Sequence, residues 1–509
     1  MAALQWLRDG FQPFSLLLPL ILLLVLIKLL LFQYKSRKHR SHLPPGPPAI
    51  PIIGNLHQLG TMPHLSLQRL AAKYGPMIYL QLGEIPTIVV SSARLAKEVM
   101  KTHDLALASR PQLFAAKHLF YNCTNVVFSP YGPYWRNIRK ICILELLSAK
   151  RVETYRSVRE EEVARLVSRI VESSPGTVDL TKFLGLYAND VLCRTVFGRD
   201  FSEGGDYHRR GFQKMLEEYQ VLLGGFSIGE FFPSLEFVHN LTGVKSRLED
   251  TFRRFDQLFD QILKEHASTK EIEEHNKDLV DVLLEVQRND SDEVPLTTDN
   301  IKAIILDMFA AGTDTTFITL DWAMTELVMN PLAMEKAQNE VRGVLGERRV
   351  VLESDLHQLQ YMKAIIKEIF RFHSPVPVLV PRESIEDVTI DGYKIPAKTR
   401  FYVNAWAIGR DKESWEDAET FKPERFLGSD IDFKGQDFEL IPFGAGRRGC
   451  PAITFANAVI ELALAQLLHS FDWELPPGVS AKDLDLTEVF GISMHRRDHL
   501  FVVAKPHFP

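Results

Sequence analysis

Cysteine is scarce in this sequence of 509 residues, which contains only Cys123, Cys142, Cys193 and Cys450. Four isolated cysteines with no CxxC pair do not form the framework of a small disulfide-rich protein, and they do not form a zinc site. The scarcity favours a reducing compartment, in which thiols stay free. Each cysteine is therefore expected to be an ordinary buried side chain or a single reactive thiol.

Two other kinds of signal are also weak or missing. No dinucleotide-binding glycine fingerprint predicts a nicotinamide module within the chain, and a net charge of −6 gives no general reason to expect nucleic-acid binding. From about residue 50 onward we find no linker-like stretch and no internal repeat. Residues 51–509 are therefore predicted to form one large domain, long enough to enclose a cofactor.

The N-terminus has a different composition. Residues 14–32 are almost wholly apolar, and this length approaches the ~20 residues that a helix needs to cross a bilayer. A basic flank at 35–40 follows directly, so the positive-inside bias places the rest of the chain in the cytosol. A cleaved signal peptide is the alternative, but the basic flank lies on the wrong side for it. We expect a membrane anchor at 1–33 and a basic, proline-rich hinge at 34–50.

Helical patterns dominate the large domain. A long helix is predicted from about 298 to 330, where Pro331 ends it, and another from Ser354, as N-cap, to Phe372. Extended segments are expected at 77–82 and 87–90, and a hairpin around Asp-Gly joins 388–390 to 393–395. These patterns predict a mainly α fold with small β-sheets.

The stretch from Pro442 to Pro451 is the most informative one. Its three glycines permit a tight loop, Cys450 ends the loop, and Pro451 suits the first position of a helix. A helix N-terminus and the loop amides are both expected to lower the pKa of the Cys450 thiol. A lone thiolate beside two arginines suits a haem iron better than zinc. The alternative is a buried structural cysteine.

Residues 310–316 place glycine and threonine in the middle of the long helix, where both are poor helix formers. Gly312 removes a side chain, so that a flat ligand can approach the backbone. Asp314 and Thr315 follow as an acid and an alcohol, a pair that can relay protons to bound dioxygen. The alternative is a kinked core helix with no chemistry.

The loop resembles the haem-binding loop of the cytochrome P-450 superfamily, whose pattern is Phe-x-x-Gly-x-Arg-x-Cys-x-Gly. Phe443, Gly446, Arg448 and Cys450 match it, whereas Ala452 replaces the final glycine. The helix segment resembles the family motif Ala-Gly-x-Asp-Thr-Thr. The apolar N-terminus and the proline run resemble the plant microsomal branch, and 314–322 looks like a subgroup that oxidises terpenoids and alkaloids.

The resemblance assigns expected roles to residues. It implies haem b with Cys450 as iron ligand and Phe443 packed beside it. The expected cofactor-binding residues are Gly446, Arg448, Trp135, Arg139 and Arg382. A structural network is expected to hold the loop, formed by Glu368, Arg371 and Arg425. An apolar substrate pocket is expected to include Phe114, Phe120, Phe309, Ala311, Val376, Leu379, Phe490 and Ile492.

The function that the resemblance implies is a monooxygenase of the endoplasmic reticulum membrane that oxidises a lipophilic small molecule. Electrons are expected from NADPH through a separate flavoprotein reductase, which docks on a basic surface near the thiolate. Two alternatives stay open at this point. One is a haem-thiolate isomerase or dehydratase that rearranges a peroxide without a reductase, although Asp314 and Thr315 argue against it. The other is a haem sensor without catalysis.

Overall fold

The computed structural model of the protein describes Pro19 and residues 42–174, 176–199, 209–224, 227–268, 277–289 and 295–508. The expected membrane anchor therefore lies outside the described residues apart from Pro19, and so does the basic part of the expected hinge. The proline run after it is extended and packs on the first strand, where the amide of Tyr79 donates to the Pro45 carbonyl at 2.9 Å. A Cβ at Gly46 would lie 2.1 Å from the carbonyl oxygen of Tyr79, so only glycine fits there.

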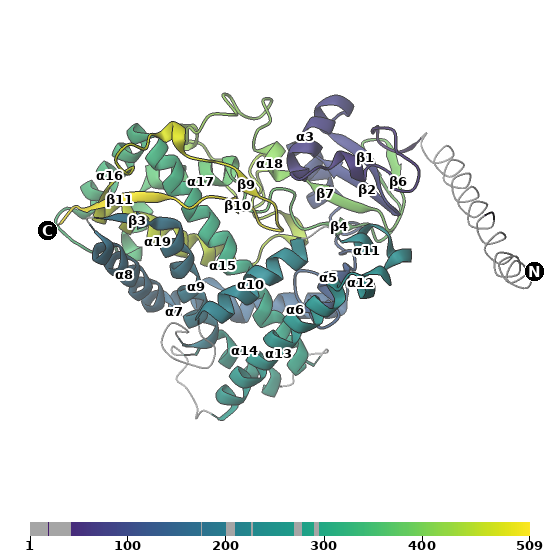
Figure 1. Cartoon of the computed structure of the whole chain (residues 1–509), viewed down its shortest axis with the longest axis horizontal. Coiled ribbons are helices and arrows are strands. Elements are labelled where there is room, and N and C mark those ends of the chain that lie inside the picture. Colours follow the sequence, from purple (N-terminus) through teal and green to yellow (C-terminus); the bar gives the residue numbers. More distant parts are fainter. Residues whose placement is uncertain are drawn as a thin grey trace, which may run out of the picture.

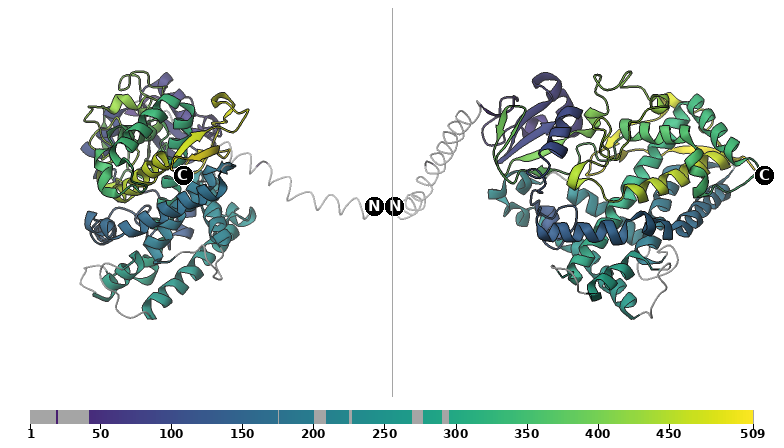
Figure 2. Two further views of the ribbon diagram at one scale, coloured as in Figure 1. Left: turned by 90° about the vertical axis from the view of Figure 1, so that its left-hand side faces the viewer. Right: turned by 180° about the vertical axis from the view of Figure 1, so that it is seen from behind.

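Helices form most of the molecule, and the strands gather in small sheets, with β1 and β2 on the right, β3 and β11 on the left, and β9 and β10 between them (Figure 1). The view from behind shows the same arrangement, with one β-rich corner and a larger helical body (Figure 2). The prediction of a mainly α fold with small β-sheets is confirmed. The helices of the described residues are α3 (Pro63–Tyr74), α4 (Ala93–Lys97), α5 (Phe114–Leu119), α6 (Pro133–Ile141), α7 (Ala149–Thr154), α8 (Arg156–Ser173), α9 (Leu180–Phe197), α10 (Arg209–Gly224), α11 (Ile228–Phe231), α12 (Val238–Leu241), α13 (Val244–Ser268), α14 (Leu279–Asn289), α15 (Thr298–Met329), α16 (Pro331–Leu345), α17 (Gln360–Phe372), α18 (Ala405–Ile408) and α19 (Ile453–Ser470).

Short turns of 3-10 or π-helix join these helices. Those used below are η3 (Glu98–Thr102), η7 (Glu353–Gln358), η8 (Pro423–Phe426), η9 (Gly446–Arg448) and η10 (Ala481–Asp483).

The strands of the described residues form four sheets. The largest has the order β1-β2-β7-β4, in which β2 and β7 are parallel and the other pairs are antiparallel. A second sheet has the order β3-β11-β8, and two hairpin-like pairs are β5-β6 and β10-β9. The bounds are β1 (Met77–Leu82), β2 (Ile85–Val90), β3 (Thr177–Asp179), β4 (Arg382–Glu383), β5 (Val388–Ile390), β6 (Tyr393–Ile395), β7 (Arg400–Val403), β8 (Phe471–Glu474), β9 (Glu488–Val489), β10 (His495–Arg496) and β11 (Phe501–Pro506).

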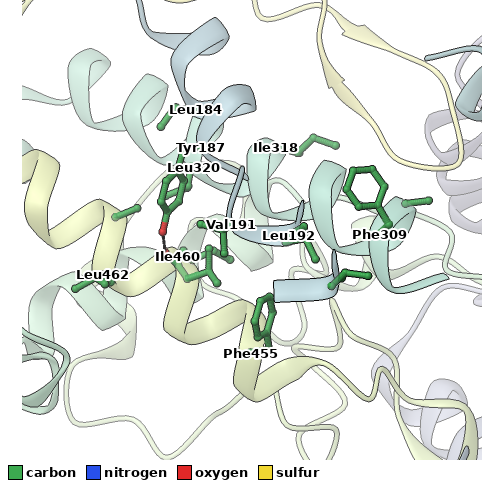
Figure 3. Packing of buried hydrophobic residues seen from close by; sticks show 14 of the residues in the cluster. Leu184, Tyr187, Val191, Leu192, Phe309, Ile318, Leu320, Phe455, Ile460 and Leu462 are labelled. Atoms are coloured by element: carbon green, nitrogen blue, oxygen red, sulfur yellow. Dashed lines mark hydrogen bonds between the residues drawn. The ribbon is translucent and has the colours of Figure 1, made fainter. Parts of the chain in front are cut away.

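The main core lies where α9, α15 and α19 pack together (Figure 3). Leu192 of α9 and Phe455 of α19 point into this contact, and the hydroxyl of Tyr187 donates to the Val459 carbonyl at 3.0 Å. Both α15 and α19 are long and apolar enough to cross a membrane, yet 67% of the most apolar 18-residue stretch of each is buried inside the protein. They are core helices, and their apolar length is explained by burial on several sides.

Most predicted elements are confirmed. The predicted long helix is α15, and the side chain of Thr297 caps it in a reciprocal capping box with Asn300. The predicted hairpin is β5-β6, and its Asp391 and Gly392 have the positive φ values of 53° and 81° that a tight turn needs.

The predicted helix start at Ser354 is wrong, because η7 occupies Glu353–Gln358 and α17 begins only at Gln360. The Asp355 carboxylate accepts from the Leu352 amide at 3.0 Å and pairs with Arg348 at 3.0 Å. These contacts stabilise a separate short turn in place of a first α-helical turn.

Candidate active site

A large cavity lies between α15 and the loop that ends at Cys450. About 1610 Å³ of space not filled by protein atoms lies in and around it, and this figure includes the solvent at its opening. Its lining is mostly apolar, with cationic side chains along one part. The structure brings these predicted site residues to its wall: Cys450, Phe443, Arg448, Trp135, Arg139, Arg382, Thr315, Ala311, Val376 and Leu379.

The loop before Cys450 is held by its own backbone and by η3. The Cys450 amide donates to the Phe443 carbonyl at 2.8 Å, which closes the loop. Gly446 has a φ of +68°, and a Cβ there would lie 2.2 Å from the carbonyl oxygen of Met100 in η3. Glycine is therefore required at this position both for its conformation and for the close approach of η3.

One detail of the loop differs from the prediction, and another adds to it. The helix α19 begins at Ile453, so Pro451 precedes the helix and is not its first residue. The Ala452 amide donates to the Cys450 sulfur at 3.4 Å, as expected for a helix N-terminus. The Ala452 amide lowers the pKa of the Cys450 thiol, as expected, and Arg139 lowers it further. Burial outweighs both effects and raises the pKa of this thiol, so a bound metal cation would be what stabilises the thiolate.

Phe443 connects the loop to the core. Its ring packs edge-on against Phe370 of α17, with centroids 5.1 Å apart, and lies 5.6 Å from the ring of Phe433. A three-ring cluster of this kind fixes the loop against α17 through many small contacts. The position of Cys450 thus depends on the position of α17.

Four guanidinium groups meet at the cavity: Arg110, Arg139, Arg382 and Arg448. Burial lowers the pKa of Arg110 well below its ordinary value, and the other three guanidiniums lower it further. Burial, Arg382 and Arg139 together lower the pKa of Arg448 to about 9. Such a cluster is costly unless anions enter it, so the site fits a flat, iron-bearing macrocycle that carries two carboxylates.

The individual donors of this cluster also contact the backbone. Arg448 donates to the carbonyls of Ala108 and Ser129, each at 2.6 Å, and its guanidinium lies 4.0 Å above the Trp135 ring. The indole N–H of Trp135 donates to the Val126 carbonyl at 3.0 Å. These contacts place Arg448 and Trp135 against the segment that follows α5.

Arg139 and Arg382 approach the loop itself. Arg139 of α6 donates to the Gly449 carbonyl at 2.6 Å. Arg382 of β4 donates to the Ala445 carbonyl at 2.7 Å and pairs with Asp104 at 2.8 Å. All three arginines that were expected to bind the cofactor therefore lie in the Cys450 loop or directly beside it. Arg110 joins them without having been predicted as a cofactor residue.

The long helix α15 is continuous through residues 310–316, which hold the predicted acid and alcohol. The hydroxyl of Thr315 donates to the Ala311 carbonyl at 2.8 Å, one turn earlier, and Thr313 bonds Phe309 in the same way. Thr315 lines the cavity, whereas Asp314 is not part of the lining. The Asp314 carboxylate accepts instead from the hydroxyl of Ser493 at 3.1 Å.

Gly312 has a packing role in addition to the one expected. A Cβ at Gly312 would lie 3.0 Å from a methyl group of Leu192 on α9. The missing side chain therefore allows α9 to approach α15, which places both helices beside the cavity. Gly312 also lines the cavity, but its Cβ direction points to α9.

Asp307 is a carboxylate in the cavity wall that the sequence reasoning missed. It is 4% exposed, and burial raises its pKa to about 7. It accepts from the Asn125 side chain and the Val126 amide, both at 2.7 Å, and from the Val127 amide at 3.2 Å. Asp307 therefore fixes the segment with Val126 and Val127, which line the cavity, against α15.

The predicted Glu368 network is present and fully buried at its centre. Glu368 and Arg371 make two parallel contacts of 2.7 Å, and both side chains are 0% exposed. Arg425 of η8 joins the same carboxylate at 3.1 Å, and the Lys422 amide donates to it at 2.7 Å. The remaining donors of Arg371 go to carbonyls of Gly409 and its following loop. The network thus ties α17 to the segment before the Cys450 loop.

Five predicted pocket residues are not among those that line the cavity in the described part of the chain. Phe114 stacks on His239 with centroids 4.2 Å apart, and Phe309 is fully buried against Phe197 at 5.8 Å. Phe120 packs on Phe128 at 5.5 Å, Phe490 is 39% exposed, and Ile492 packs partly buried against the core.

The spacing Gly-x-Gly-x-x-Gly does occur once, at Gly444, Gly446 and Gly449. In the described structure the element before this loop is η8 and not a strand, and the next α-helix begins only at Ile453. It lacks the strand–turn–helix setting of a dinucleotide fingerprint, so no nicotinamide module follows from it.

Comparison with known proteins agrees with this geometry. The family model "Cytochrome P450" matches residues 44–502. The chain is 74% identical over its whole length to cytochrome P450 71AP13 of Prunus mume, covering 98% of that protein. It is 46% identical to premnaspirodiene oxygenase of Hyoscyamus muticus, with 94% of this chain and 96% of that protein covered. It is 45% identical to strychnine-11-hydroxylase of Strychnos nux-vomica, with 97% and 98% covered.

Among solved structures, a zebra fish cytochrome P450 determined with abiraterone superimposes with a TM-score of 0.74 at 26% identity, over 88% of this chain and 100% of that one. The fold, the thiolate loop and the guanidinium cluster therefore have one common explanation. The chain belongs to the cytochrome P450 family and is a haem-thiolate monooxygenase, which uses haem b and receives the electrons of NADPH through a reductase.

Proposed function

We propose that the protein inserts one oxygen atom into a lipophilic plant specialised metabolite, a terpenoid or an alkaloid. The observation that carries this proposal is the apolar wall around Val126, Val127, Ala311, Val376 and Leu379 beside the Cys450 loop. An apolar wall suits a hydrophobic small molecule. The names of two relatives, premnaspirodiene oxygenase and strychnine-11-hydroxylase, support the same substrate classes.

We assign the binding of the haem to the residues around the loop. When bound, the haem supplies the activation of dioxygen and the transfer of one oxygen atom to carbon. Cys450 would be the ligand to iron, and Phe443, which packs on Phe370, would hold the loop that carries it. Arg448, Arg139, Arg382 and Trp135 are assigned to the two propionates, because a carboxylate entering the guanidinium cluster relieves its mutual repulsion.

The substrate class is tested by incubating the full-length protein and a plant reductase with a panel of sesquiterpenes and indole alkaloids. A product that is heavier by one oxygen atom, and that requires NADPH, supports the proposal. A panel without any such product, combined with oxidation of polar phenolic compounds, would contradict it.

We propose that residues 1–33 anchor the protein in the endoplasmic reticulum membrane, with 34–50 as a hinge and the catalytic domain 51–509 facing the cytosol. The apolar run and the basic flank after it support this arrangement. Protease treatment of sealed microsomes tests it, since a cytosolic domain is digested and a lumenal one is protected.

Thr315 is proposed to deliver protons from its place in the cavity wall. Replacement of Thr315 by alanine should preserve haem binding but lower the product formed per NADPH about 10-fold, with hydrogen peroxide released instead. Thr313→Ala is the matched control, because Thr313 makes the same bond to the preceding turn but does not line the cavity. Peroxide release, NADPH oxidation and product are measured together. Full coupling in Thr315→Ala would contradict the relay.

The reductase is proposed to dock on the basic surface formed by Arg136, Lys140 and Arg447, which are exposed beside the Cys450 loop. Arg447 also pairs with Asp104 at 3.0 Å, so reversing its charge would disturb Arg382 as well. Arg136→Glu and Lys140→Glu, both on α6, are therefore the cleaner variants.

Arg136→Glu combined with Lys140→Glu should raise the apparent KM for reductase several-fold at low ionic strength and less at high salt, because screening weakens the attraction. Lys482→Glu in η10 is the control for a charge reversal elsewhere. Steady-state assays with varied reductase make the measurement. A KM that stays constant at low salt argues against this surface.

A further inference from the structure

The turn between β9 and β10 reaches the acid of the long helix. Ser493 lies in this turn and is 7% exposed, and its hydroxyl donates to the Asp314 carboxylate at 3.1 Å. This contact joins residues 179 positions apart in the sequence. Asp314 is next to Thr315 in the sequence, but its carboxylate is directed to Ser493 and is not part of the cavity lining.

The turn itself is held firmly at several points. The Met494 amide donates to the Pro375 carbonyl at 2.9 Å, and Pro375 lines the cavity. Arg496 of β10 contacts the Thr325 hydroxyl on α15 at 2.5 Å, and both side chains are buried. The residues that follow Ser493 are therefore fixed relative to α15, and they hold the backbone that carries the Ser493 hydroxyl.

The other side of the turn touches the end of α10. A Cβ at Gly224, the last residue of α10, would lie 2.4 Å from the Ile492 amide nitrogen and 2.8 Å from the Gly491 carbonyl carbon. Backbone thus lies directly against backbone, and there is no side chain between them that could absorb a displacement. A movement of the end of α10 would be passed to the turn and so to Ser493.

We propose that Ser493 is a positioning residue for the monooxygenase reaction: its hydroxyl holds the Asp314 carboxylate in the orientation from which Asp314 supplies protons towards Thr315. The proposal rests on the relay role proposed above for Asp314 and Thr315. A hydrogen bond from a neutral hydroxyl to a carboxylate is charge-assisted and directional, so it limits the rotation of the acid. The bond also makes the relay sensitive to the turn that α10 contacts.

The electron balance of the enzyme without any organic substrate provides a test that needs no identified ligand. One NADPH and one proton reduce dioxygen to hydrogen peroxide, whereas two NADPH and two protons reduce it to two waters. Proton delivery decides between these outcomes, because only the second requires cleavage of the O–O bond. The ratio of NADPH oxidised to dioxygen consumed therefore reports the relay directly.

The experiment uses the full-length holoenzyme with reductase, NADPH and air, and rates are expressed per haem. Ser493→Ala should raise the peroxide share about two-fold or more, and Ser493→Thr, which keeps a hydroxyl, should restore it. The solvent deuterium isotope effect on NADPH oxidation should increase in Ser493→Ala, because proton transfer becomes slower. A purely structural role would lower haem content and would leave both readouts per haem unchanged.

Asp314→Asn separates the two levels of the proposal. It should raise the peroxide share at least as much as Ser493→Ala, and the double variant should be no worse than Asp314→Asn alone, since both changes act on one group. If Asp314→Asn has no effect, the relay itself is wrong. If Asp314→Asn raises peroxide but Ser493→Ala does not, or if the two effects add fully, the relay stands and the positioning role of Ser493 is wrong.

Discussion

Replacement of Cys450 by serine should abolish the red-shifted Soret band of the reduced, carbon monoxide-bound protein, and it should also abolish monooxygenase activity. An alcohol is a much weaker electron donor to iron than a thiolate. The loss should be chemical and not structural, because the Cys450 amide bond to the Phe443 carbonyl and the η3 contact of Gly446 do not involve sulfur. Difference spectra of the reduced protein with and without carbon monoxide make the measurement.

Cys142→Ser is the matched control for this experiment. Cys142 is fully buried, and burial raises the pKa of its thiol to about 12, so the thiol stays neutral. Cys142 is also not among the residues that line the cavity. The control should keep the red-shifted band even if it lowers stability slightly. A Cys450→Ser protein that retains the band would mean that another side chain holds the iron, and the whole assignment would have to be abandoned.

The parts of the site that could be predicted from sequence are those whose residues lie close together in the chain. The Cys450 loop, the Thr315 helix and the Glu368–Arg371 pair each span ten residues or fewer of local pattern. Their spacing is set by a turn or by the helical repeat, which sequence shows directly. The structure adds to this pattern the third partner, Arg425, at 3.1 Å, in agreement with the resemblance.

The properties that sequence could not supply depend on distant partners. Arg110 contacts the Val380 carbonyl 270 positions away, and Asp307 accepts from the Val126 amide 181 positions away. Nothing in the residues next to Arg110 or Asp307 indicates a buried charge. For the same reason the sequence indicates the loop amides that lower the pKa of the Cys450 thiol, but it does not show the burial that outweighs them.

The aromatic residues that were expected in the pocket show a second limit of prediction from sequence. Phe309 precedes Ala311 by two positions on α15, and two positions on a helix face different directions. Ala311 lines the cavity while Phe309 is fully buried against Phe197 of α9. An apolar residue near a motif therefore has no fixed side in a helix that is buried all round, and only packing decides which residues meet the substrate.

Replacement of Glu368 by alanine should give a protein that fails to retain haem. The substitution removes the carboxylate between Arg371 and Arg425 and leaves two guanidiniums without their anion, with Arg371 0% exposed. Removing one member of a buried charge network costs about 3–5 kcal/mol. Because Phe370 of the same helix packs on Phe443, a displaced α17 also releases the Cys450 loop.

Glu153→Ala is a matched control, since Glu153 and Arg156 form an ion pair with the same spacing of three residues on α7 and α8. That pair has an N–O distance of 2.6 Å, but its side chains are 56% and 44% exposed. Exposed pairs contribute only about 0.2–1 kcal/mol, so haem content should stay normal. The comparison isolates burial as the reason for the expected loss.

The network should also behave as one unit. Arg371→Ala alone should lose haem about as completely as Glu368→Ala, and the double variant should be no worse than either, since each single change already breaks the same set of contacts. Glu368→Gln keeps the shape but not the charge and should retain part of the haem. Haem content per protein and thermal unfolding are measured for all four variants. Normal haem content in Glu368→Ala, or losses that add across the double variant, would show that the Cys450 loop is held by Phe370 and Phe443 packing without the charge network.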